Sequence, residues 1–199
     1  MKDSILIFCR EEKMSLLRRY VSMLLEQNSK LSNVEIASMA AHRGQMRRSG
    51  EEYITHPFAV AQLMRKHYPG NSTLYNTALL HDTLEDAIDN NNVEDEAELF
   101  AIIANAVDSD AEAAKIIDLV SILTKYPGED YDTYMQLLYK NPNALRVKLA
   151  DMQHNLSSNP SPGQIKKYSK AVRSIEAVFQ GRPDFINPGQ WASLMELIQ

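Results

Sequence analysis

Apolar residues recur along most of the chain at spacings of three and four residues, which is typical of amphipathic α-helices. The clearest case is a stripe formed by Leu145, Leu149, Met152 and Leu156. No segment alternates apolar and polar residues clearly enough to predict a β-strand. The pattern therefore predicts an all-α fold.

Capping residues, prolines and glycines divide this pattern into separate helices. Ser32 and Glu35 form a capping-box pattern at one helix start, and Ser72 is expected to cap a continuous helix that reaches Asp86. The expected helices cover 11–28, 32–43, 57–68, 72–86, 95–107, 110–123 with Asp110 as its cap, 130–140, 142–156, a long segment from Gly163 to Phe179, and a short one after Pro188. A polar, basic loop covers 44–55.

The chain has 199 residues, which fits one domain of ordinary size. There is no internal repeat and no linker long enough to demand a second domain. We therefore expect a single domain over 1–199. The loop from Arg182 to Gly189 is long enough to let the tail, residues 182–199, pack separately.

The net charge of -5 argues against general binding to nucleic acid or to anionic membranes. Local basic groups at 43–48 and 166–173 still suit a small phosphorylated ligand. The single cysteine, Cys9, favours a reducing compartment. No apolar stretch is long enough for a signal peptide or a membrane span, so we expect a cytoplasmic protein.

The segment HDTLED, residues 81–86, combines one imidazole with three carboxylates. In a continuous helix, His81 and Glu85 lie on one line, while Asp82 and Asp86 lie on a neighbouring line. All four side chains would then face one cleft. Mixed nitrogen and oxygen ligands suit Mn, Fe, Zn or Co better than Ca. The segment therefore predicts part of a metal site.

Two further ligands are expected from distant segments. Asp151 borders the apolar stripe together with Lys148 and Asn155, so it could complete the site from that border. His56 lies at a helix start beside the basic loop, which makes it the fourth candidate. His154 falls opposite the stripe and is left out. Taken singly, His56 could also be a helix cap and Asp151 a solvated residue.

Three segments carry a family resemblance in this order: AHRGQMRRSGEEYITHP at 41–57, LLHDTLED at 79–86 and VKLADMQHN at 147–155. They resemble the HD-domain hydrolases of the RelA/SpoT type, which remove the 3′-pyrophosphate from guanosine tetra- and pentaphosphate in the stringent response. The resemblance spans about 33–175. It implies an HD-domain helical bundle and a stand-alone small alarmone hydrolase, with the helix at 11–28 and the tail as additions and no room for a synthetase domain.

The resemblance also implies roles for individual residues. One Mn²⁺ ion would be held by His56, His81, Asp82 and Asp151. Glu85 and Asp86 would activate or orient water and manage protons. The nucleotide would be contacted by Arg47 at the purine, by Asn155, by Arg48 and Lys148, and by the hydroxyl of Ser158.

Two departures from the family pattern bear on the substrate more than on the metal. Ala87 follows the HDTLED segment where the family commonly has Thr, and Met152 stands where an Arg commonly follows Asp151. The alternatives left open are an adenosine alarmone or another 3′-phosphorylated nucleotide as substrate, a general HD nucleotidase acting on 5′-monophosphates or cyclic nucleotides, and a catalytically silent regulator. The metal identity and a homo-oligomeric state are also open.

Overall fold

The computed structural model describes residues 31–89 and 91–198. Within these ranges the chain is helical and has no strand, and a single isolated bridge pairs Met46 with Glu52. The predicted all-α fold is therefore confirmed. The helix expected over 11–28 lies outside the described residues.

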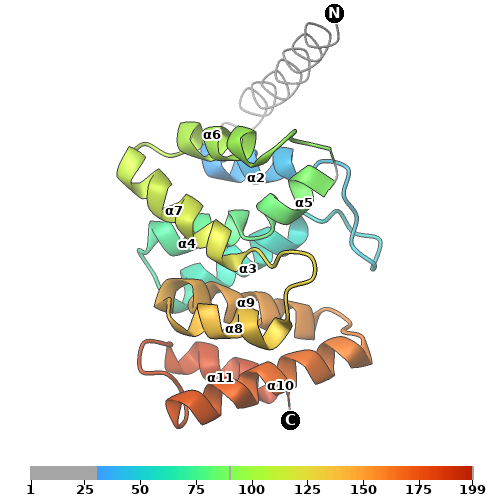
Figure 1. Cartoon of the computed structure of the whole chain (residues 1–199), viewed down its shortest axis with the longest axis vertical. Helices are drawn as coiled ribbons and strands as arrows, with labels where there is room; N and C mark the ends of the chain where they lie inside the picture. Colours follow the sequence, from blue (N-terminus) through green and yellow to red (C-terminus); the bar gives the residue numbers. More distant parts are fainter. Residues whose placement is uncertain (1–30, 90, 199) are drawn as a thin grey trace, which may run out of the picture.

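The described helices follow the predicted order closely (Figure 1). They are α2 (Asn33–Ala41), α3 (Thr55–His67), α4 (Ser72–Leu80), α5 (Thr83–Asp89), α6 (Glu96–Ala106), α7 (Asp110–Leu123), α8 (Tyr131–Tyr139), α9 (Pro142–Ser157), α10 (Pro162–Phe179) and α11 (Pro188–Glu196).

Side-chain caps explain several helix starts. The predicted capping box at Ser32 and Glu35 is present, with both reciprocal hydrogen bonds formed. Two caps differ from the prediction. Asn71, one residue before Ser72, caps α4 by accepting from a backbone amide, and Ser109 holds the N-cap position of α7. Both differences are shifts of a single residue.

The continuous helix expected over 72–86 is wrong, because it breaks after Leu80. The Thr83 hydroxyl donates to the Leu80 carbonyl at 2.7 Å, and Nδ1 of His81 lies 2.8 Å from the Ala78 carbonyl oxygen. Such local side-chain bonds to the backbone compete with regular helix geometry. As a result, His81 and Asp82 project from a turn between two helices.

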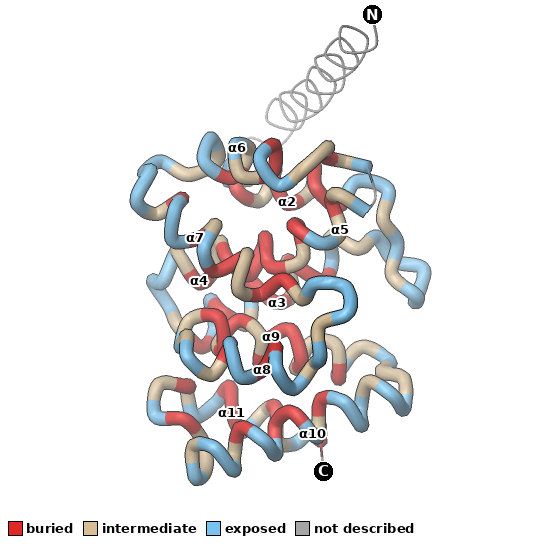
Figure 2. Tube along the Cα trace, viewed as in Figure 1, coloured by how far each residue is buried: buried red, intermediate tan, exposed pale blue. Residues whose placement is uncertain are grey.

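The helices stack into a bundle centred on α3 and α4. These two pack against each other, α9 packs along α3, and α7 and α2 pack on α4. Figure 1 places α2 and α6 at one end and α10 and α11 at the other. Figure 2 shows the buried positions of α3, α4 and α9 in the middle of the bundle. The predicted stripe of α9, from Leu145 to Leu156, is buried in this core.

The C-terminal segment packs on the bundle and not separately as the loop length suggested. Gln190 on α11 is fully buried, accepts from the Tyr68 hydroxyl at 2.6 Å and donates to the Arg146 carbonyl at 2.8 Å. The Arg146 guanidinium in turn donates to the Phe185 carbonyl. This network ties α11 to α3 and α9.

Among the helices that the structure describes, none combines the length and the apolar character needed to cross a bilayer.

Replacing Gln190 by Ala should lower the free energy of unfolding by about 1–3 kcal/mol, because it removes the two hydrogen bonds that its buried amide makes with the Tyr68 hydroxyl and the Arg146 carbonyl. Urea denaturation followed by circular dichroism measures this change. Gln136→Ala, at an exposed position of α8, is the matched control and should stay near the wild-type value. Equal unfolding midpoints for the two variants would contradict the role given to Gln190.

Candidate metal centre

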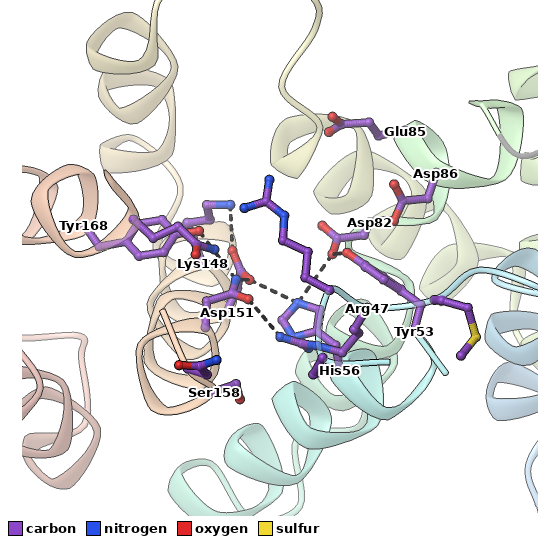
Figure 3. Close-up of a pocket in the computed structure, with 16 residues that line it drawn as sticks. Arg47, Tyr53, His56, Asp82, Glu85, Asp86, Lys148, Asp151, Ser158 and Tyr168 are labelled. Carbon is purple, nitrogen blue, oxygen red and sulfur yellow. Dashed lines mark hydrogen bonds and ion pairs between the residues drawn. The ribbon is translucent and has the colours of Figure 1, made fainter. Parts of the chain in front are cut away.

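A cavity of about 570 Å³ opens where the loop before α3 meets α5, α9 and the start of α10 (Figure 3). Its lining includes every residue predicted for the site except His81, which lies beneath the floor against Asp82. The lining residues are Met46, Arg47, Arg48, Ser49, Tyr53, His56, Asp82, Glu85, Asp86, Lys148, Asp151, Asn155, Ser158, Asn159, Gln164 and Tyr168. Three distant segments of the sequence thus form one site.

The four predicted metal ligands meet at the base of this cavity. Nε2 of His56 lies 3.2 Å from Oδ1 of Asp151 and 3.5 Å from Oδ2 of Asp82. Nε2 of His81 lies 3.1 Å from the same Asp82 oxygen and 3.8 Å from the same Asp151 oxygen. His56, His81 and Asp82 each offer a ligand atom within 4.8 Å of the others. The first turn of α3, the turn after α4 and the middle of α9 supply these side chains.

The groups around the two ring nitrogens of His81 indicate whether a cation fits this centre. The residue is 2% exposed, and its Nδ1 lies against the Ala78 carbonyl oxygen, which can only accept. A neutral ring therefore carries its proton on Nδ1 and turns the lone pair of Nε2 towards Asp82. That buried Nε2 has no hydrogen-bond partner. Because a lone pair and a carboxylate oxygen repel each other, a divalent cation between them fits the arrangement.

The surroundings of His81 also favour positive charge. Burial, the largest single influence, would lower the pKa of His81, but the Asp82 and Asp151 carboxylates together outweigh it and raise that pKa to about 10. Burial would likewise raise the pKa of Asp82, yet the His81 and His56 rings hold it well below its usual range. The negative charge of the carboxylates, which retains a proton on the imidazole, would also attract a metal ion.

Asp151 is held in its charged form by its neighbours on α9. The Lys148 ammonium donates to its Oδ2 at 2.7 Å, and the Asn155 amide donates to its Oδ1 at 2.5 Å. Burial opposes charge on both Asp151 and Lys148, but their mutual attraction keeps the pKa of the acid low and that of the amine high. Lys148, predicted to contact the nucleotide, is thus also the partner of a predicted metal ligand.

The two candidate acids lie on the α5 side of the cavity (Figure 3). Burial, followed by repulsion from the Asp82 carboxylate, raises the pKa of Asp86 to about 6. The same two causes raise the pKa of Glu85. A carboxyl group whose pKa approaches neutrality can both accept and return a proton.

The remaining predicted residues also line the cavity. Arg47 comes from the loop before α3, and its guanidinium lies 3.4 Å from the side-chain oxygen of Asn155. Arg48 and Ser158 also line the cavity. Cationic and hydrogen-bonding groups therefore share the cavity with the two acids, a combination suited to a phosphorylated ligand.

Three residues that lie at the site were not predicted from the sequence. The Tyr53 hydroxyl donates to Asp82 at 2.6 Å, and His42 lies 3.8 Å from Asp86. The exclusion of His154 is wrong, because its Nδ1 lies 2.7 Å from Nδ1 of His56. His154 follows Asp151 by three residues and therefore shares its side of the helix, which was the available signal. Tyr53 lies within the irregular loop before α3 and His42 just ahead of that loop, and neither carries a periodic signal.

Comparison with known proteins finds similar proteins, but no family model matches the chain. The chain is 31% identical over 153 residues to a GTP pyrophosphokinase of Streptomyces coelicolor, which covers 75% of this chain and 17% of that protein. It is 31% identical over 159 residues to the bifunctional (p)ppGpp synthase/hydrolase SpoT of Escherichia coli K12 and to a guanosine-3′,5′-bis(diphosphate) 3′-pyrophosphohydrolase of Shigella flexneri, covering 76% of this chain and 21% of each. The chain thus spans about a fifth of the length of these relatives.

Loss of a residue that hydrogen-bonds to a metal ligand typically weakens metal binding by roughly 10- to 100-fold. Replacing His81 by Ala removes a predicted ligand atom itself, so it should weaken Mn²⁺ binding by more than that. Isothermal titration of the purified chain with Mn²⁺ measures this loss.

The matched control is His67→Gln, which changes another buried imidazole at the far end of α3. It should leave Mn²⁺ affinity at the wild-type value. Equal losses in both variants would assign the effect to general destabilisation and not to the metal centre.

Proposed function

This chain belongs to the RelA/SpoT family over about three quarters of its length, and from that premise we propose that it hydrolyses the 3′-pyrophosphate of guanosine tetra- and pentaphosphate with Mn²⁺ as cofactor. The observation that carries the proposal is the pair of acids with raised pKa, Glu85 and Asp86, in one cavity with candidate metal ligands at its base. The products would be GDP or GTP and pyrophosphate.

The names of the relatives cover both making and breaking of the alarmone. One is named a GTP pyrophosphokinase, one a synthase/hydrolase and one a 3′-pyrophosphohydrolase. Proton-handling carboxyl groups next to a cation site suit the activation of water, which hydrolysis requires. A site that only bound a nucleotide would have little need for these groups, so they favour hydrolysis.

The chemistry divides between the cofactor and the chain. A bound divalent cation would polarise a phosphoryl oxygen and lower the pKa of water. Glu85 or Asp86 takes a proton from the attacking water, whose oxygen bonds to the phosphorus attached at the 3′ position. The bond between that phosphorus and O3′ breaks, and O3′ takes up a proton as pyrophosphate leaves.

The cavity also offers what a charged nucleotide needs. Phosphoryl transfer depends mainly on positioning and on neutralising phosphate charge. Arg47, Arg48 and Lys148 supply positive charge, while Asn155 and Ser158 supply hydrogen-bonding groups. The volume of about 570 Å³ lies within the range of roughly 300–1,000 Å³ that is usual for small-molecule sites.

Glu85→Gln and Asp86→Asn should each lower kcat by about 10²–10⁴-fold while leaving Mn²⁺ binding intact, since each removes a group that transfers protons and not a ligand. Pyrophosphate release from ppGpp in the presence of Mn²⁺ measures turnover. Asp89→Asn, an exposed carboxylate on the same helix, is the matched control and should keep wild-type turnover. Full turnover in both active-site variants would contradict the roles proposed for them.

A nucleotide panel tests the substrate. The purified chain with Mn²⁺ should release pyrophosphate from ppGpp and pppGpp, and it should leave 5′-monophosphates and cyclic nucleotides intact. Turnover of an adenosine 3′-pyrophosphate in place of ppGpp would overturn the base assignment and leave the reaction type standing. Binding of ppGpp without any turnover would instead indicate a regulator.

A further inference from the structure

His154 lies between the metal centre and the loop that carries Arg47. Its Nδ1 is 2.7 Å from Nδ1 of His56 and 3.4 Å from Nη1 of Arg47. Its Nε2 is 3.4 Å from the hydroxyl oxygen of Ser158. The rings of His154 and His56 are tilted against each other, with centroids 4.9 Å apart. Both ring nitrogens of His154 are therefore in contact with polar groups.

The chemistry of arginine fixes where the protons on these rings lie. A guanidinium carries only N–H groups and a positive charge, so Arg47 at 3.4 Å favours a lone pair and not a proton on Nδ1 of His154. Two ring nitrogens at 2.7 Å need one proton between them, and His56 must supply it because Nδ1 of His154 is an acceptor. The proton of a neutral His154 then lies on Nε2, where the Ser158 oxygen can accept it.

This proton order has a direct consequence for the metal centre. With its proton on Nδ1, His56 turns the lone pair of Nε2 towards Asp82 and Asp151, at 3.5 and 3.2 Å. Only that tautomer can bind a cation at this place. The second imidazole, His81, is oriented in the same way by a backbone carbonyl. A partner on the outer nitrogen commonly sets the tautomer and direction of a metal-binding histidine.

We infer that His154 is a positioning residue, which fixes the metal-binding tautomer of His56 by accepting its Nδ1 proton and links that ligand to Arg47. The inference rests on the proposed function, because it presumes that the His56 centre binds a divalent cation. This role differs from that of the neighbouring Asn155, whose side-chain amide donates directly to the candidate ligand Asp151.

Two substitutions separate the acceptor role from ring packing. His154→Phe keeps a ring of similar shape but removes the acceptor, so Mn²⁺ affinity should fall by about 10- to 100-fold. His154→Asn places a carbonyl oxygen close to the former Nδ1, so most of the affinity should return. Isothermal titration with Mn²⁺ alone gives the result without any turnover, and His67→Gln serves as the control for a buried imidazole outside the site.

A spectroscopic measurement observes the proton itself. In the Zn²⁺-loaded chain, which is diamagnetic, ¹⁵N–¹H spectra of the His56 ring should show a proton on Nδ1 in the wild type and in His154→Asn. That signal should be weakened by exchange with solvent in His154→Phe, where no acceptor protects it.

The outcomes distinguish the two levels of the proposal. Unchanged Mn²⁺ affinity in His154→Phe overturns the positioning role alone, as does His154→Asn binding as weakly as His154→Phe. Failure of the wild-type chain to bind Mn²⁺ would instead overturn the metal centre, and the proposed function with it.

Discussion

The buried negative charge of Asp151 is the constraint on which the rest of the site depends. The residue is 3% exposed inside a bundle of helices, where an isolated carboxylate would be very costly. Its cost is offset by the Lys148 ammonium at 2.7 Å and by the Asn155 amide, both on α9. Nε2 of His56, on α3, lies 3.2 Å from the same carboxylate, so a cation bound between them would hold α3 and α9 together.

The packing of α9 sets the direction of that charge. Leu149 and Met152 on either side of Asp151 are fully buried in the core, which leaves the helix little freedom to rotate about its axis. The rotation that buries the stripe also turns Lys148, Asp151 and Asn155 towards the cavity. Helix α9 therefore contributes both buried core residues and residues of the candidate site.

The features that could be predicted from the sequence are those decided locally. The apolar stripe of α9 and the Ser32 capping box depend on neighbours within one or two turns, and both are present. The break after Leu80 depends on local bonds from the side chains of His81 and Thr83 to the backbone, which helical periodicity does not reveal, and the place of His154 depends on another element. Helical arithmetic put His154 opposite the core, yet the side of α9 away from the stripe is not solvent there, because the start of α3 brings His56 against it. Tyr53 illustrates the same limit, since nothing in its own segment indicates a hydrogen bond to Asp82.

The anchoring of α11 bears on the order in which the chain can fold during synthesis. Tyr68 and its partner Gln190 are 122 residues apart, and Arg146 completes the network from α9. Contacts at such sequence separation form late and slow folding. While a ribosome is still making α11, the candidate metal ligands on α3, in the turn after α4 and on α9 are already present, but α3 and α9 expose the surfaces that α11 will cover. A nascent chain thus holds every candidate ligand before the framework that keeps them in place is complete.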